Sequence, residues 1–178
     1  MSNKPFIVVI AVLVIGFGVI VATKKAQPQA PVIGTQHADL GQKHLDSLTE
    51  KHAAYNSNLP SSGSHYVKPA PWGIETETVP DEQFVHNEEH GGVVVAYKPD
   101  MPETEVAKLK QIASNLTFTD SKDSIKGFKV LMFPRAKNDK PIELASWKCT
   151  LSLDEVSTAT IKTFYRQHLN KSPEARAS

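Results

Sequence analysis

The hydrophobic pattern separates one long apolar segment near the N-terminus from a mixed polar and apolar remainder. Residues 6–22 read FIVVIAVLVIGFGVIVA, an uncharged run of 17 residues with Lys4 before it and Lys24 and Lys25 after it. A helix rises about 1.5 Å per residue, so this run covers most of a hydrocarbon core of about 30 Å. It is longer than the apolar region of a cleaved secretory signal, which has about 7–15 residues. The pattern predicts an uncleaved transmembrane anchor, so the membrane is an expected partner of the chain.

The sequence around this run sets the predicted boundaries. We expect an anchor over residues 1–25 and an extended tether over residues 26–34, because AQPQAPVIG holds two prolines and no charge. A single soluble domain would follow over residues 35–172, with a tail over residues 173–178. Lysines flank both ends of the apolar run, so the positive-inside bias does not fix the orientation. A short N-terminus before an apolar run is the usual form of a signal anchor. We therefore expect attachment to the inner (cytoplasmic) membrane, with the domain facing the periplasm or the cell exterior.

The remainder of the chain alternates between strand-like and helix-like patterns. We expect a short helix within residues 35–51 and a long ordered loop over residues 55–73, which is rich in proline, glycine and serine. Three β-branched or aliphatic runs predict strands, and two amphipathic stretches predict helices. In chain order these are strand 93–97, helix 102–115, strands 128–133 and 142–147, and helix 153–169. The order predicts an α+β fold in which a three- or four-stranded sheet carries its helices on one face, after an N-terminal transmembrane helix.

Charge and cysteine content narrow the chemistry. The chain has 20 Lys and Arg against 19 Asp and Glu, a formal net charge of +1. No basic tract is present, so a nucleic acid is not an expected partner, and no protein partner is indicated. The single cysteine, Cys149, excludes an intrachain disulfide and a cysteine-paired zinc ribbon but not a site built from histidine and methionine. Cys149 falls near the start of the last predicted helix, where we expect a partly buried, inert thiol.

Histidines are the main chemical signal. Six of the seven histidines lie between residues 37 and 90. His86 and His90 are spaced i and i+4, so one helical turn would let both imidazoles bind one ion, and His65 is the first choice for a third ligand. Thioether sulfur would favour copper over zinc, because soft ligands select Cu(I). The secondary ligand candidates are Met101, Met132, His52 and His44. An ordinary hydrogen-bonded or solvated side chain is the alternative for each histidine, and it is favoured at His37, His44 and His168.

The segment from His86 to His90 also matches the H-x-x-E-H pattern of inverzincin metalloproteases, with Glu89 as the general base. That mechanism needs the motif in the body of a helix, a carboxylate ligand on a later helix and a substrate cleft. Two glycines and a β-branched run follow His90 at once, so we expect only about one turn of helix here. Glu89 is thus the only catalytic candidate, and its alternative role is to orient a ligand histidine or to cap a turn.

Several segments together carry a family resemblance. They are YNSNLPSSGSHY (55–66), PAPWG (69–73), DEQFVHNEEHGGVVVAYKP (81–99) and a late SWKCTLSLDE segment. The chain resembles the bacterial and archaeal family catalogued as domain of unknown function 3105, whose members often carry an N-terminal transmembrane segment. The family pattern Y-N-S-x-P-P-T-S-G-x-H-Y, W-G, V-H-N-L-E-H-G-G and A-W-G-R corresponds to Tyr55, Asn56, Pro60, Ser62, Gly63, His65, Tyr66, Trp72, Gly73, His86, Asn87, Glu89, His90, Gly91 and Trp147. His37, His44 and His52 resemble histidines found upstream in some members.

The chain departs from that pattern at six positions. Leu59 replaces a proline, Ser61 a threonine and Glu88 a leucine. Ser146, Lys148 and Cys149 stand where the late segment usually has alanine, glycine and arginine. The resemblance implies no activity.

Three functions remain open on the sequence. The first is a membrane-tethered, extracytoplasmic metal-binding domain, for copper first and zinc second, with His65, His86 and His90 as ligands. The second is a structural or interaction module in which a histidine and glutamate network orders the long loop without a metal. The third is a metal-dependent hydrolase that uses Glu89.

Overall fold

Three aliphatic runs form the centre of a sheet. The computed structural model describes residues 31–116, 118–119 and 126–177. Strands β5 (Val93–Tyr97) and β9 (Ile142–Ser146) are buried at every position, and β8 (Val130–Pro134) at all but its last residue. Burial on both faces explains why these runs lack the polar alternation of a half-exposed strand. The strand predictions for these three segments are confirmed to within two residues.

The described sheet has six strands in the order β1-β10-β9-β5-β8-β4. The central β5 is parallel to β8 and antiparallel to β9, so the sheet is mixed. Strand β10 (Cys149–Leu153) extends it as an antiparallel hairpin partner of β9. Its edges are two short strands, β1 (Thr35–Gln36) and β4 (Gly73–Ile74). Two further pairs lie outside this sheet, β2 (His44–Leu45) with β3 (His65–Tyr66) and β6 (Phe118–Thr119) with β7 (Lys126–Gly127).

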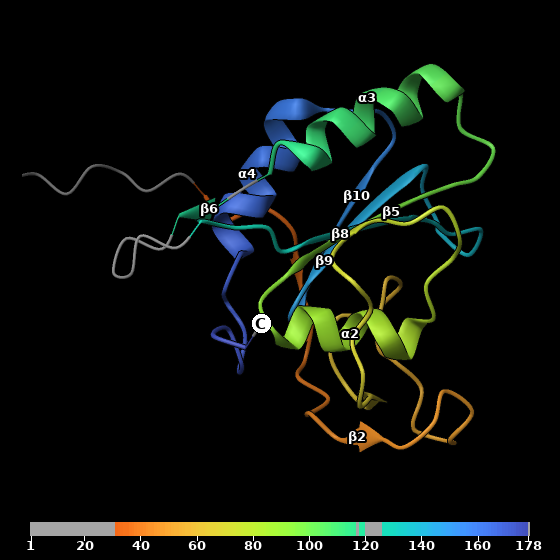
Figure 1. The fold of residues 1–178 in the computed structure, drawn as a ribbon, viewed down its shortest axis with the longest axis vertical. Helices are drawn as coiled ribbons and strands as arrows, with labels where there is room; N and C mark the ends of the chain where they lie inside the picture. Colours follow the sequence, from red (N-terminus) through yellow and green to blue (C-terminus); the bar gives the residue numbers. More distant parts are fainter. Residues whose placement is uncertain (1–30, 117, 120–125, 178) are drawn as a thin grey trace, which may run out of the picture. The chain divides into compact units, whose positions relative to one another are not determined.

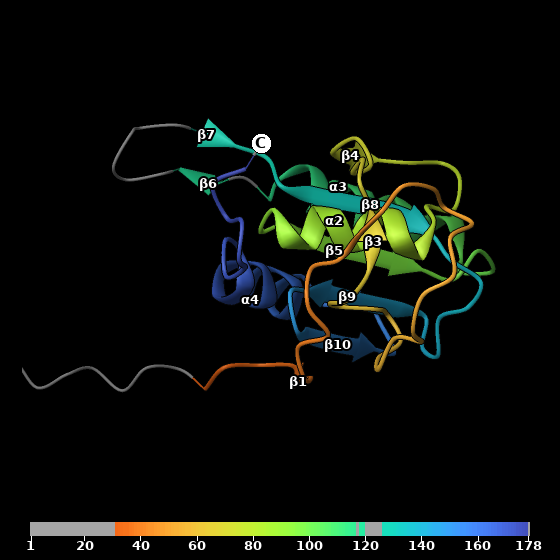
Figure 2. The same cartoon turned by 90° about the horizontal axis from the view of Figure 1, so that it is seen from below.

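Helices cover both faces of the sheet (Figure 1). Helices α3 (Glu103–Ser114) and α4 (Thr158–His168) share an apolar cluster with alternate sheet residues such as Val95 and Met132. Helix α2 (Asp81–Glu89) shares a second cluster with the opposite face, where Val94 and Leu131 point. Figure 2 looks onto the face of the sheet that α2 covers. The site described below lies on the α2 side.

The predicted fold is wrong in its sheet and in its helix arrangement. The sheet has six strands rather than three or four, and the helices occupy both faces rather than one. The short helix expected within residues 35–51 is replaced by β1, β2 and bends, and the last helix begins at Thr158 because residues 149–153 form β10. Cys149 is therefore a strand residue.

The transmembrane part of the fold prediction is also corrected. The described residues contain three helices, and none of them has the length and apolar character needed to cross a membrane. The fold is accordingly a mixed α+β domain without such a helix in its described part. Residues 6–22, on which the anchor prediction fell, lie outside the described residues. The extracytoplasmic location stays a prediction.

Candidate metal centre

Helix α2 presents three potential ligand side chains in its last turn. Pro80 precedes the helix, and Asp81 and Glu82 complement the positive end of its dipole in the first turn. His86, Glu89 and His90 follow at i, i+3 and i+4, a spacing that places them on one side of the helix. Nine residues are helical, so the motif has more support than the single turn predicted from the sequence.

The short parallel pair β2–β3 brings two more histidines to this helix. Its register sets His44 opposite His65, and Leu45 opposite Tyr66. Leu45 is fully buried and anchors the pair, and β3 packs along α2. The His44 and His65 rings meet edge to face with centroids 4.8 Å apart. Two segments that are far apart in the sequence therefore present their imidazoles side by side.

The loop before β3 is held in place by Tyr55 and Gly63. The Tyr55 hydroxyl donates a 2.6 Å hydrogen bond to the carbonyl of Ser64, and its ring lies against Gly63. Gly63 has φ +123°, and a Cβ there would stand 3.3 Å from both the Tyr55 ring and Leu40. Glycine is thus required by both the backbone conformation and the close packing. The carbonyl of Gly63 is aimed at the His65 ring as a result.

Asn87 connects the following loop to α2. Its side-chain amide donates to the Ala70 carbonyl and accepts from the Ala70 backbone N–H, both at 2.9 Å. Asn87 is fully buried, and these two bonds satisfy polar groups that would otherwise be unpaired inside the protein. Asn87 therefore attaches the loop at Ala70 to the helix that carries the site.

Backbone carbonyls fix the orientation of two imidazoles. His65 Nδ1 donates to the Gly63 carbonyl at 2.8 Å, and His86 Nδ1 donates to the Tyr66 carbonyl at 2.7 Å. A carbonyl oxygen can only accept, so the hydrogen of each neutral ring is on Nδ1 and the Nε2 atom carries a lone pair. Metal-binding histidines are held in the same way in most metalloproteins.

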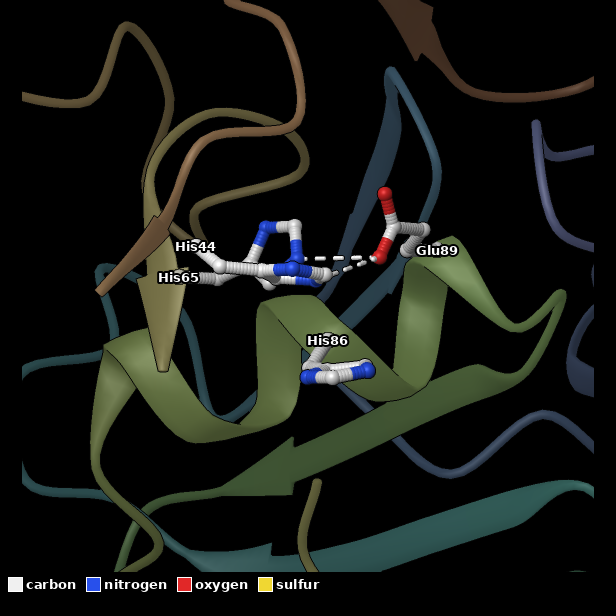
Figure 3. Close-up of side chains that lie close together, drawn as sticks. All are labelled: His44, His65, His86 and Glu89. Carbon is white, nitrogen blue, oxygen red and sulfur yellow. Dashed lines mark hydrogen bonds and ion pairs between the residues drawn. The ribbon is translucent and has the colours of Figure 1, made fainter. Parts of the chain in front are cut away.

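The Glu89 carboxylate lies at one side of the cluster and faces the imidazoles of His44 and His65 (Figure 3). Its Oε2 atom is 2.9 Å from His65 Nε2 and 3.4 Å from His44 Nε2, and its Oε1 accepts a 2.7 Å hydrogen bond from Gln42. Ligand atoms from His44, His65, His86 and Glu89 all lie within 4.8 Å of one another. Glu89 is 1% exposed and His65 is fully buried, whereas the His44 side chain is 46% exposed. The cluster is thus buried except at His44, whose side chain is exposed to solvent.

The short contact between His65 Nε2 and Glu89 Oε2 requires a proton or a metal cation between the two atoms. Burial lowers the pKa of His65, and this effect exceeds the opposing influence of the Gly63 carbonyl and of Glu89. Neutral His65 directs the lone pair of its Nε2 at a carboxylate oxygen only 2.9 Å away. Two such acceptors repel each other unless a proton or a metal cation lies between them. The arrangement therefore fits two states, a protonated hydrogen-bonded pair or a metal complex.

The donor set fits a divalent transition metal. Bonds of about 2.0–2.1 Å in a tetrahedral zinc site separate the ligand atoms by about 3.4 Å. The separation from Glu89 Oε2 to His44 Nε2, 3.4 Å, matches that value, and the separation to His65 Nε2, 2.9 Å, is shorter. Imidazole nitrogen suits zinc and copper, and the carboxylate supplies a negative charge that offsets part of the charge of the ion. These four residues could hold a metal ion, and their geometry does not identify which one.

The other ligand candidates from the sequence are not part of this group of four residues. His90 Nε2 is 3.0 Å from His86 Nε2 but belongs to a neighbouring group with Glu89 and Glu174. His52 bonds instead to Glu82 and to the Ala53 carbonyl. Met132 is buried in the cluster under α3 and α4, and Met101 packs against the same cluster, on the face of the sheet opposite α2.

Three residues set aside on the sequence make ordinary contacts. His37 bonds to Thr150, and His168 to the Ile33 carbonyl. Burial raises the pKa of Cys149 to about 11, as expected for an inert thiol.

Sequence reasoning ranked three residues of the site too low. His44 was a secondary candidate, although the β2–β3 register sets it beside His65. Glu89 was given an orienting or catalytic role rather than a direct place in the cluster. Gln42, which orients the Glu89 carboxylate, was not considered. The spacing of His86, Glu89 and His90 could have identified Glu89 as a ligand, whereas a pairing between two-residue strands leaves no signal in the sequence.

A comparison with known families supports the family resemblance that the sequence motifs carry. A family model described as Protein of unknown function (DUF3105) matches residues 47–178. The chain belongs to this family. Within the DUF3105 match lie His65, His86 and Glu89, whereas His44 and Gln42 precede it. No curated protein and no solved structure matches the chain significantly.

Proposed function

We propose that this DUF3105 protein is a metal-binding domain that holds a divalent transition-metal ion through His44, His65, His86 and Glu89. The observation that carries the proposal is the approach of Glu89 Oε2 to His65 Nε2 at 2.9 Å, in a buried setting where the Nδ1 hydrogen of His65 is already committed to the Gly63 carbonyl. A cation between these atoms removes the repulsion and uses the lone pairs of the surrounding imidazoles.

The ligand set supports zinc or copper(II) ahead of copper(I). The copper preference predicted from the sequence requires thioether sulfur from Met101 or Met132. Both residues lie on the face of the sheet opposite the histidine cluster. Three imidazoles and one carboxylate are borderline and hard ligands, which suit Zn²⁺ and Cu²⁺. We place Zn²⁺ first because four protein ligands match the closed tetrahedral sites that this ion prefers.

Hydrolytic activity has less support. A general base must reach a water molecule beside the metal ion. Both oxygens of Glu89 contact protein groups, and the residue is 1% exposed. A pocket among the described residues is lined by Lys98, Glu105 and Asp154, among others, and contains none of the residues of the H-x-x-E-H segment.

Thermal unfolding with and without metal tests this proposal. The full chain would be stripped with a chelator and unfolded alone, with Zn²⁺ and with Cu²⁺. An ion that binds only the folded state adds about 2.7 kcal/mol at a concentration 100 times its Kd. His44→Ala, which alters a half-exposed side chain and leaves the buried histidines intact, should reduce this shift strongly. His65→Ala should abolish it.

His37→Ala is the matched control, because His37 also makes one side-chain hydrogen bond but lies outside the cluster. It should keep the full shift. A metal-induced shift of equal size in the wild type, His44→Ala and His65→Ala would overturn the proposal. No shift in the wild type would favour the second function, in which a protonated His65–Glu89 pair orders the loop.

A further inference from the structure

A second potential metal position shares Glu89 with the first. Ligand atoms of Glu89, His90 and Glu174 lie within 4.8 Å of one another, and His90 Nε2 is 3.8 Å from Glu174 Oε2. This group adjoins the proposed centre directly, because His86 Nε2 and His90 Nε2 are 3.0 Å apart. The potential ligand atoms of the two groups therefore lie next to one another at the end of α2.

Glu174 is brought to this position by the C-terminal segment. The Glu174 backbone N–H donates to the carbonyl of Glu89 at 3.1 Å, and the Asn170 N–H donates to that of Gly91 at 2.8 Å. These bonds fasten the segment to the end of α2 (Figure 1). The backbone of Glu174 is therefore fixed at the end of α2, which places its side chain within reach of His90.

Lys129 strengthens this attachment. Its ammonium group donates to the carbonyls of His90, Ala175 and Ala177 at 2.7, 2.9 and 2.8 Å. Lys129 is only 9% exposed, and burial lowers its pKa. Three charge-assisted hydrogen bonds compensate for that burial. One buried side chain therefore ties the carbonyl of the ligand candidate His90 to the segment that carries Glu174.

The 3.0 Å contact between His86 Nε2 and His90 Nε2 is a hydrogen bond, and an ion at each residue would replace it. His86 Nε2 presents a lone pair, since its Nδ1 hydrogen is donated to the Tyr66 carbonyl. An ion bound at His86 uses this lone pair and removes it as a hydrogen-bond acceptor for His90. A second ion between His90 and Glu174 would bind His90 Nε2 once the hydrogen of that nitrogen has been released.

On this basis, and assuming that the proposed metal centre exists, we propose that the protein binds a pair of divalent cations bridged by the Glu89 carboxylate. His44, His65 and His86 hold the first ion, and His90 and Glu174 hold the second. Carboxylate ligands and a separation of about 3.5–4 Å are typical of two-metal sites. The Glu174 side chain is 50% exposed, so the second ion has fewer protein ligands, is open to water and exchanges faster than the first.

Stoichiometry distinguishes this inference from the function on which it rests. Metal-free full chain would be titrated with Zn²⁺ by calorimetry, and separately loaded with Cu²⁺ for electron paramagnetic resonance. We expect about two equivalents in the wild type and about one in Glu174→Gln. Glu105→Gln, which removes a similarly exposed carboxylate that pairs with Lys108, should retain two. Lys129→Met should weaken the second equivalent, because it releases the segment that carries Glu174.

The copper signal tests the bridge itself. Two Cu²⁺ ions joined by one carboxylate interact magnetically, so the wild type should show less signal than its copper content, whereas Glu174→Gln should show one full spin per copper. Saturation of the wild type at one equivalent would overturn the two-ion centre and leave the proposed function intact. Two equivalents in Glu174→Gln, or two magnetically isolated ions in the wild type, would also overturn it. No binding in the wild type would overturn both.

Discussion

Arg135 binds the carboxylate of Asp81 with two hydrogen bonds of 3.0 Å, one from Nε and one from a terminal nitrogen. A further bond of 2.6 Å runs from Arg135 to the Asn58 side chain. Arg135 is 3% exposed, follows β8, and connects the first turn of α2 to the loop that leads to His65. The orientation of α2 therefore depends on an interaction in its first turn, whereas the residues of the candidate metal centre lie at its other end.

Arg135→Ala should destabilise the protein by about 3 kcal/mol or more, because it removes both short hydrogen bonds from the partly buried Asp81 carboxylate. The free energy of unfolding in urea measures this change. Lys137→Ala is the control, since Lys137 is 79% exposed and lies 3.9 Å from the same carboxylate. Its loss should change stability by less than about 0.5 kcal/mol. Equal effects of the two substitutions would contradict the role assigned to Arg135.

Glu88 carries a buried carboxyl group with no hydrogen-bond partner on either oxygen among the described residues. Burial raises its pKa well above the usual range, and the charge of Asp81 acts in the same direction. Its neighbours Phe84 and Val85 face the apolar cluster between α2 and the sheet. Leucine, which the DUF3105 pattern has at this position, would suit the same environment.

Glu88→Leu should stabilise the protein by about 1–3 kcal/mol, the range for removing an unsatisfied buried polar group. Urea unfolding of the chelator-treated protein measures this without interference from metal binding. Glu82→Leu on the same helix, where the carboxylate is partly exposed and bonds to His52, should give no comparable gain. A loss of stability in Glu88→Leu would show that the carboxyl group makes a favourable interaction.

Cys149 should resist alkylation in the folded protein. It is fully buried in β10, and burial raises its pKa to about 11. Only the thiolate reacts, so at pH 8 both protonation and lack of access slow the reaction. Labelling with a maleimide, followed by mass spectrometry, should give no adduct in the native chain while a denatured sample becomes fully labelled. Rapid labelling of the native chain at pH 8 would contradict this description.

The central strands could be predicted because their composition alone requires burial. Val93–Tyr97 has no polar position before its tyrosine, which suits a strand covered on both faces. Strand β10 is not predicted from the sequence, because its last residue, Leu153, also fits the start of the helix expected over residues 153–169. The helix begins only at Thr158, after Ser157 caps it through the Thr160 N–H. Helix α2 has little amphipathic pattern, because it buries polar residues such as Asn87 and Glu88 as well as Phe84.

The candidate site was only partly predictable for a different reason. His65 and His86 could be selected from clustering and motif spacing, but His44 reaches them through a strand pairing of two residues, and Glu174 through the C-terminal segment. Such contacts depend on tertiary structure. One departure from the family pattern gains a physical meaning: Lys148 has φ +61°, a left-handed conformation in the β9–β10 turn that favours the glycine usual at this position.

Metal content of the full chain is the most direct test of the central claim. The protein would be purified without a histidine tag, supplied with Zn²⁺ or Cu²⁺, desalted and measured by elemental analysis beside His65→Ala and His37→Ala. We predict at least one equivalent in the wild type and in His37→Ala, and a loss of that equivalent in His65→Ala. Metal at background level in the wild type, or an unchanged content in His65→Ala, would contradict the assignment of this histidine cluster as a metal centre.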